Sequence, residues 1–155
     1  IQKLIYYYFD QIMEMVEKQP PNIIAHLDLV KKFNKGNRFF PEDSAWYRQK
    51  VEEVLQVIAK SDCIVEVNTR SYFKKLNETF SPGDWILKRC LELKIPVTLS
   101  ADAHAPQEVT SYLPEAAHKL RYIGFETIRV LKNNQWIDLP FDKNGIKKYR
   151  NREIS

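Results

Sequence analysis

Apolar residues near the start of the chain recur at the spacing of an α-helix. The residues that would share one face of this helix are Ile5, Phe9, Ile12, Met13 and Val16. Pro20 and Pro21 follow, and a proline cannot donate the backbone hydrogen bond that would continue a helix. The pattern therefore predicts an amphipathic helix over residues 2–18.

Short, continuous apolar runs further along the chain indicate buried strands. The first three runs cover residues 22–26, 63–68 and 95–100. Runs of this length without alternation are typical of parallel strands that are covered on both faces. Residues 127–131 form a fourth run, and Asn133-Asn134 separates it from residues 136–139, which we predict to be its hairpin partner.

Helices are predicted between these runs. Asp43-Ser44 provides a capping signal for a second helix. Residues 81–84, Ser-Pro-Gly-Asp, combine a turn with a cap and open a third helix, after a loop that contains Tyr72-Phe73. A fourth helix is expected over roughly residues 107–123.

Strands and helices therefore alternate, which predicts an α/β fold with a parallel sheet. His26 to Glu66 spans 40 residues and Glu66 to Asp102 spans 36, the length of successive strand–helix units. A complete barrel of such units needs about 250 residues. Because this chain has 155 residues and begins inside a helix without Met, we expect the first half of a barrel to precede it. The expected domain covers residues 1–140, followed by a polar tail over residues 141–155.

Candidate metal ligands follow the predicted strands. In parallel α/β folds, functional groups gather at the carboxyl ends of the strands. Two of the three histidines, His26 and His104, lie at such ends, and Asp102-x-His104 could present a carboxylate and an imidazole on one side of an extended segment. The alternative is that Asp102 caps a helix and His104 is a bystander. The convergence of strand ends favours a metal site made of His26, Asp102 and His104.

Other polar residues near these ends are candidates for binding a substrate. Glu66 and Asn68 lie two residues apart, on the same side of the second strand. An unpaired buried carboxylate is costly, so Glu66 either belongs to the site or pairs with Arg70 or a lysine. Lys32 and Arg70 follow the first two strands and could bind a phosphate group, although solvated loop charge is the alternative.

Composition adds a modest positive charge and few cysteines. Lys and Arg number 24 against 20 Asp and Glu, a net charge of +4, with basic groups in residues 31–38 and 147–152. An excess of this size favours anionic ligands only weakly. Cys63 and Cys90 form no paired motif, no apolar run approaches about 18 residues, and no signal peptide opens the chain. We therefore expect a cytoplasmic protein without a membrane partner.

At these residues the sequence resembles the PHP family of histidinol-phosphatases. Residues 24–33 resemble the GHLDL-x-R/K-R/K-F/Y segment of that family, with Ala25 where glycine is usual. Residues 66–70 resemble its E-I/V-N-T strand, and residues 96–104 resemble its P-V/I-T-L-S/G-S/A-D-A-H segment. Order and spacing match over nearly the whole chain, so the resemblance is specific.

The resemblance implies the C-terminal part of a distorted (β/α)7 TIM-like barrel that holds up to three divalent metal ions. Enzymes of this family hydrolyse L-histidinol phosphate to L-histidinol and phosphate in histidine biosynthesis. By motif, His26, Asp102 and His104 carry over as metal ligands, and Asp102 and His104 as catalytic residues. The residues that would bind the substrate are Lys32, Glu66, Asn68 and Arg70. His and carboxylate ligands suit Zn, Mn and Fe alike, so the metal stays open.

The chain also departs from the family. The opening His-x-His motif, a further pair of histidines and a bridging glutamate belong to the first half of the barrel and are absent here. We therefore expect the isolated chain to be inactive, or to act with a partner that carries the N-terminal half. The alternatives are a PHP-type nuclease and a non-catalytic module whose basic C-terminal residues bind nucleic acid. The sequence shows no extended basic and aromatic surface, so a small phosphorylated substrate is expected rather than nucleic acid.

Overall fold

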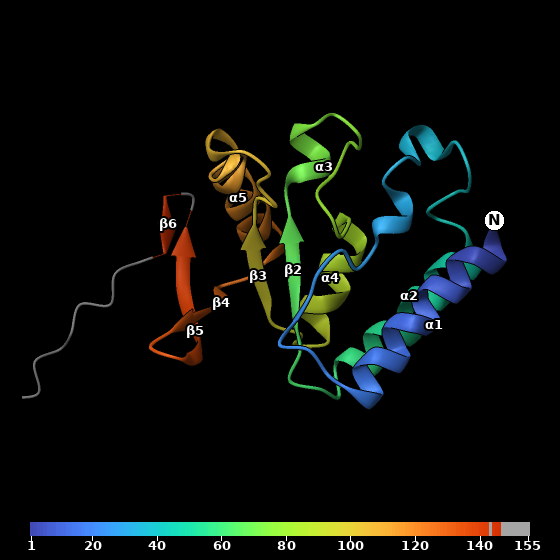
Figure 1. Ribbon diagram of the computed structural model, residues 1–155, viewed down its shortest axis with the longest axis horizontal. Helices are drawn as coiled ribbons and strands as arrows, with labels where there is room; N and C mark the ends of the chain where they lie inside the picture. Colours follow the sequence, from blue (N-terminus) through green and yellow to red (C-terminus); the bar gives the residue numbers. More distant parts are fainter. Residues whose placement is uncertain (143, 147–155) are drawn as a thin grey trace, which may run out of the picture.

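The computed structural model describes residues 1–142 and 144–146 (Figure 1). The helices are α1 (Gln2–Lys18), α2 (Ala45–Ile58), α3 (Arg70–Phe73), α4 (Asp84–Glu92) and α5 (Leu113–Ile123), with short 3-10 turns at Leu29–Lys31, Lys35–Asn37 and Pro106–Glu108. The strands are β1 (Ile23–Ile24), β2 (Ile64–Asn68), β3 (Val97–Ser100), β4 (Thr127–Lys132), β5 (Gln135–Asp142) and β6 (Gly145–Ile146). In the described part of the chain, no helix is both long and apolar enough to cross a bilayer.

The first three strands form a parallel sheet in the order β1-β2-β3. The prediction of an α/β fold is therefore confirmed. All five residues of β2 are buried, as expected for the central strand of a sheet that is covered on both faces. Because the strands run in the same direction, their carboxyl ends meet at one edge (Figure 1).

The last three strands form a separate antiparallel sheet in the order β4-β5-β6. The predicted hairpin is confirmed, since β4 pairs with β5 from Thr127↔Pro140 to Lys132↔Gln135. Asn133 and Asn134 both have positive φ angles, 50° and 59°, which turn the chain back on itself in a tight hairpin.

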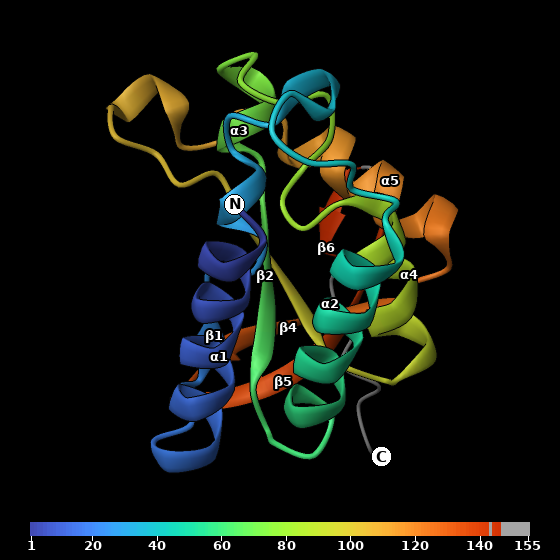
Figure 2. The same cartoon turned by 90° about the vertical axis from the view of Figure 1, so that its right-hand side faces the viewer.

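The helices lie next to one another, α1 against α2, α2 against α4, and α4 against α5 (Figures 1 and 2). The predicted apolar face of α1 is confirmed, because Ile5, Phe9, Ile12 and Val16 are buried. Ser44 does occupy the N-cap position of α2, but its hydroxyl makes no capping hydrogen bond and has no partner among the described residues. The packing of apolar side chains, rather than the predicted cap, therefore stabilises this helix. Both cysteines are unpaired and buried.

The predicted helix over residues 107–123 is wrong in its first third. The structure has a 3-10 turn at Pro106–Glu108, and α5 begins only at Leu113. Tyr112, with φ of 59°, occupies the left-handed region, which no residue in a continuous right-handed helix can do. Pro114 lies in the first turn of α5, where its missing N–H costs nothing.

Two further predictions are corrected by local structure. The segment with Tyr72-Phe73, expected to be a loop, contains the single-turn helix α3. The expected polar tail from residue 141 begins inside the hairpin, since β5 reaches Asp142 and the Phe141 ring is only 1% exposed. Burial of this large apolar ring explains why the chain stays folded here. The basic group at residues 147–152 lies outside the described residues.

Candidate functional site

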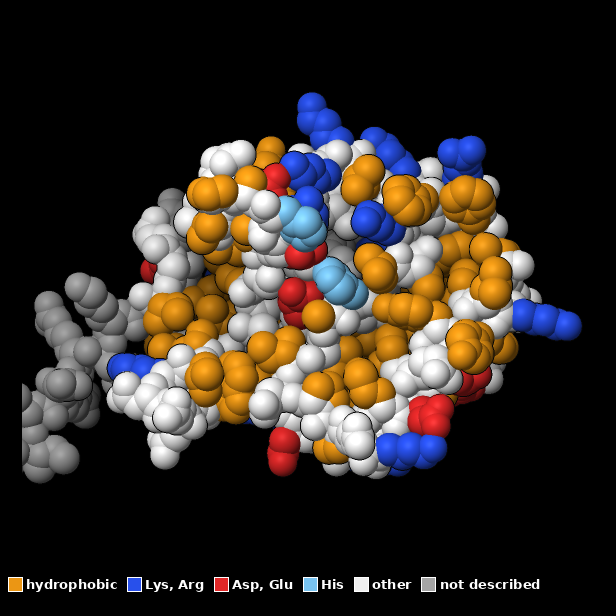
Figure 3. All heavy atoms as spheres, in the orientation of Figure 1, with side chains coloured by type: hydrophobic (Ala, Val, Ile, Leu, Met, Phe, Trp, Pro, Cys, Tyr) orange, Lys and Arg blue, Asp and Glu red, His pale blue; other side chains and the backbone are white. Residues whose placement is uncertain are grey.

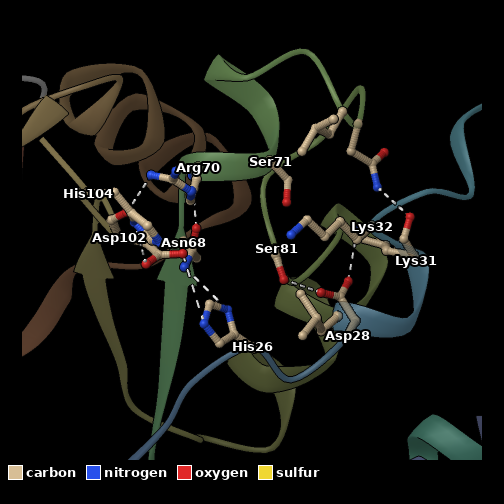
Figure 4. Close-up of a pocket in the computed structure, with 13 residues that line it drawn as sticks. His26, Asp28, Lys31, Lys32, Asn68, Arg70, Ser71, Ser81, Asp102 and His104 are labelled. Carbon is tan, nitrogen blue, oxygen red and sulfur yellow. Dashed lines mark hydrogen bonds and ion pairs between the residues drawn. The ribbon is translucent and has the colours of Figure 1, made fainter.

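The carboxyl ends of β1, β2 and β3 open into a pocket of about 250 Å³ (Figure 4). The space-filling view shows two histidine side chains near one another with acidic side chains beside them, and basic side chains above (Figure 3). Six of the predicted site residues line this pocket: His26, Lys32, Asn68, Arg70, Asp102 and His104. The structure therefore brings together residues that are up to 78 positions apart in the sequence.

His26 leaves the sheet through a left-handed backbone conformation, with φ of 56°. This explains why the predicted strand over residues 22–26 ends at Ile24. The backbone N–H of His26 donates to Glu66 Oε2 at 3.1 Å, and its carbonyl accepts a hydrogen bond from the Tyr8 hydroxyl. A non-glycine residue in this region costs on the order of 1 kcal/mol, and these two contacts offset that strain. The turn directs the His26 imidazole into the pocket.

Asp102 adopts a second left-handed turn, with φ of 50°, just after β3. Its backbone N–H donates to Ser100 Oγ at 3.1 Å. One carboxylate oxygen lies 3.9 Å from His26 Nε2, and the other lies 3.7 Å from His104 Nδ1. The Asp102 carboxylate therefore lies between the two imidazoles at distances too long for direct hydrogen bonds.

The His104 ring has one nitrogen available for a ligand. Its Nδ1 lies 2.9 Å from the backbone carbonyl of Asp102. A carbonyl oxygen only accepts hydrogen bonds, so in the neutral ring Nδ1 carries the hydrogen and Nε2 keeps its lone pair. The side chain is 63% exposed, which leaves Nε2 accessible. The alternative in which Asp102 caps a helix is excluded, because Ala105 precedes the 3-10 turn and Tyr112 precedes α5.

Glu66 and Asn68, both in β2, accept hydrogen bonds from the backbone just beyond the ends of β1 and β2. Glu66 Oε2 accepts hydrogen bonds from the His26 backbone and from Asn68 Nδ2, at 3.1 and 3.3 Å. Asn68 Oδ1 accepts from the backbone N–H of Arg70 at 2.8 Å. The alternative pairing of Glu66 with Arg70 is wrong, since the Arg70 guanidinium contacts Glu108 instead. These contacts fix the backbone around His26, and a direct role of Glu66 in binding a substrate stays a prediction.

The two adjacent lysines after β1 differ in their surroundings. Lys31 is 2% exposed, and its ammonium contacts Asp28 Oδ2 at 2.8 Å, Thr79 Oγ1 at 3.1 Å and the carbonyl of Phe80 at 3.2 Å. Lys32 is half-buried and lines the pocket. Within the described residues, no carboxylate lies within 4.0 Å of the Lys32 ammonium. Lys32 is therefore the lysine that can bind an anionic ligand.

Arg70 is held at the rim of the pocket by the loop that follows β3. Its Nη1 donates to the carbonyl of Asp102 at 2.9 Å and to Glu108 Oε2 at 2.8 Å. Hydrogen bonds from Lys74, from the His104 backbone and from Arg70 lower the pKa of Glu108 to about 2. Glu108 was not predictable from the sequence, because its partner Arg70 lies 38 residues away and no local pattern signals the contact.

The donors at this site suit a divalent metal in chemistry but form an incomplete set. Two imidazole nitrogens and a carboxylate are ligands that Zn, Mn and Fe accept. In the described part of the chain, no three His, Cys, Asp or Glu side chains are grouped closely enough to hold an ion by themselves. If the site holds a metal ion, His26, Asp102 and His104 would therefore supply only part of its ligands.

A parallel α/β sheet with polar and basic residues at its strand ends is an architecture typical of enzymes. No family model matches the chain. Over 109 residues the chain is 28% identical to a protein of Schizosaccharomyces pombe named "Probable histidinol-phosphatase", covering 66% of this chain and 33% of that protein. The crystal structure of a protein from Listeria monocytogenes described as a "putative histidinol phosphatase" matches with a TM-score of 0.61 and 26% identity, covering 70% of this chain and 42% of that one.

These similarities relate the chain, at a coarse level, to hydrolases named as histidinol phosphatases. The chain spans about a third of the length of the yeast relative, 33%, and 42% of the bacterial structure. The α/β architecture is shared with that structure over the matched part.

Proposed function

We propose that this chain is the C-terminal part of a PHP-type barrel that hydrolyses phosphomonoesters in a metal-dependent reaction. The observation that carries the proposal is the Asp102 carboxylate between His26 and His104, 3.9 and 3.7 Å away, at the shared rim of three parallel strands. L-histidinol phosphate is the proposed substrate, because the relatives carry the name of its phosphatase. Histidine biosynthesis is then the pathway, and the cytoplasm is the proposed compartment.

In this proposal His26, Asp102 and His104 hold part of a cluster of divalent ions. Bound divalent ions would supply an activated water and neutralise charge on the phosphoryl oxygens. Lys32 and Arg70 bind the phosphate, Lys32 as a point charge and Arg70 through the guanidinium hydrogens that Glu108 and Asp102 leave free. The leaving alkoxide needs a proton, which we assign to the carboxyl group of Asp102, since His104 Nε2 would hold the metal through its lone pair and its Nδ1 hydrogen is bonded to the Asp102 carbonyl.

The proposal requires a partner for this chain. A polypeptide corresponding to the first half of the barrel would supply the remaining metal ligands, which three donors alone do not provide. We propose that the chain without this half does not turn over substrate.

The test compares Asp102→Ala with a matched control, Asp43→Ala, whose side chain is exposed and remote from the pocket. Phosphate release from L-histidinol phosphate is measured with Mn²⁺ or Zn²⁺, for the chain alone and together with a separate polypeptide that supplies the first half of the barrel. We expect turnover only in the second case, its loss in Asp102→Ala, and its retention in Asp43→Ala. Unchanged turnover in Asp102→Ala would refute the assignment.

The same assay separates the alternatives. Faster hydrolysis of single-stranded DNA than of L-histidinol phosphate would favour a PHP-type nuclease. Salt-dependent binding to a DNA duplex, without hydrolysis of either substrate, would favour a non-catalytic basic module.

A further inference from the structure

One carboxylate outside the pocket contacts two residues of the candidate site. Glu108, in the 3-10 turn after β3, is only 9% exposed and does not line the pocket. Its Oε2 accepts hydrogen bonds from Arg70 Nη1 at 2.8 Å and from the backbone N–H of His104 at 2.9 Å. Its Oε1 accepts a hydrogen bond from Lys74 Nζ at 2.5 Å. A single side chain thus joins a candidate phosphate-binding residue to a candidate metal ligand.

The guanidinium of Arg70 is clamped by the same loop at a second point. Nη1 also donates to the carbonyl oxygen of Asp102 at 2.9 Å. Both hydrogens of Nη1 are therefore used within the loop, whereas an arginine has five N–H donors in a rigid planar fork. Among the described residues, no acceptor engages the Nε or Nη2 hydrogens of Arg70. The clamp leaves these three hydrogens for an anion and fixes the plane in which they lie.

We propose that Glu108 is a positioning residue of this site, which holds the Arg70 guanidinium and the His104 backbone in one fixed relation. The inference rests on the proposed function, because it assigns Arg70 to the phosphate and His104 to the metal. Glu108 itself touches neither ligand. It sets the distance between the cation that binds the phosphate and the loop that carries two of the metal ligands.

The charge of Glu108 allows positioning to be separated from simple electrostatics. Neutralising a carboxylate beside Arg70 and Lys74 makes the rim more positive, which by itself strengthens the binding of an anion and weakens that of a cation. Loss of positioning weakens the binding of both. The sign of the change in phosphate affinity therefore distinguishes the two roles.

The experiment uses Glu108→Gln and Glu108→Asp, with Glu126→Gln as the control on an exposed surface position. Isothermal titration of the full chain, together with a separate polypeptide that supplies the first half of the barrel, gives the affinities for inorganic phosphate and, separately, for Mn²⁺. We expect about tenfold weaker Mn²⁺ binding in Glu108→Gln, as for other residues that orient metal ligands, and weaker phosphate binding as well. In Glu108→Asp the charge is kept but the carboxylate is withdrawn by one methylene, so phosphate binding should also weaken.

Each outcome decides the inference. Tighter phosphate binding in Glu108→Gln, or unchanged affinities in Glu108→Asp, overturns the positioning role while leaving the proposed function intact. If the wild-type chain binds neither phosphate nor Mn²⁺ even with that polypeptide present, the proposed function is overturned and this inference with it. Circular dichroism verifies that the variants are folded, and protection of the His104 amide from hydrogen exchange in the wild type tests the clamp without any substitution.

Discussion

The two adjacent lysines after β1 should respond in opposite ways to the same substitution. We predict that Lys31→Met destabilises the protein strongly, whereas Lys32→Met leaves its stability almost unchanged. The reason is the environment of the two ammonium groups. Lys31 is 2% exposed beside the fully buried Asp28, while Lys32 faces the pocket.

The magnitude follows from the contacts of the Lys31 ammonium. Loss of the hydrogen bond to the Asp28 carboxylate costs about 1.5–3 kcal/mol of stability. Loss of the hydrogen bonds to the neutral acceptors, the Thr79 hydroxyl and the Phe80 carbonyl, costs about 1 kcal/mol each. Together these give about 3.5–5 kcal/mol, within the range of about 3–5 kcal/mol found when one partner of a buried ion pair is removed. Asp28 keeps two donors, the hydroxyl of Ser81 and the backbone N–H of Gly83, which do not neutralise its charge.

Urea unfolding, followed by circular dichroism, measures this difference. With a slope of about 2 kcal/mol/M, the midpoint of Lys31→Met should fall by roughly 2 M. Lys32→Met should stay within about 0.5 kcal/mol of the wild type and should instead weaken the binding of inorganic phosphate. If the free energies of unfolding of the two variants differ by less than about 1 kcal/mol, the buried pair of Lys31 and Asp28 does not stabilise the protein as predicted.

Three further predictions concern other parts of the chain. Phe141→Ala should cost about 3–5 kcal/mol in urea unfolding, because its ring is 1% exposed; a loss below about 1 kcal/mol would show that residues 141–142 do not belong to the folded hairpin. Gly83→Ala should cost about 1–3 kcal/mol, because a Cβ there would lie 2.7 Å from the Lys31 ammonium, which its three contacts hold in place; wild-type stability would mean that Lys31 moves freely. The pKa of Glu108 is lowered from 4.5 to about 2, chiefly by the hydrogen bond from Lys74, so its stabilising contribution is complete above about pH 4.5 and is lost as the pH falls through about 2. The difference in Tm between wild type and Glu108→Gln should therefore shrink over this interval, and a constant difference would contradict the depressed pKa.

Periodicity predicted those elements whose pattern is local. The helix over residues 2–18 and the strands around Val65 and Leu99 follow directly from the distribution of apolar side chains. The late start of α5 was not predictable in this way, because the preceding segment is held by the contact of Glu108 with α3. The hairpin after β4 was predictable, because Asn133-Asn134 is a local turn signal, and both residues do adopt positive φ angles.

The candidate site was predictable only in outline. Because side chains at the ends of parallel strands meet, the sequence predicted that His26, Asp102 and His104 lie close together. The sequence could not show that Lys31 is buried against Asp28 while Lys32 faces the pocket, since both follow the same strand. That difference depends on residues 79–83, about 50 positions away, which close over one lysine and not the other.

The brevity of β1 has a consequence for how the molecule behaves in a crowded solution. Edge strands with unpaired backbone groups recruit strands from neighbouring molecules, and short edges limit such recruitment. β1 offers only Ile23–Ile24 at this edge before the chain departs at His26. The turn that presents an imidazole to the pocket therefore also limits the backbone that this edge offers to a strand of another molecule.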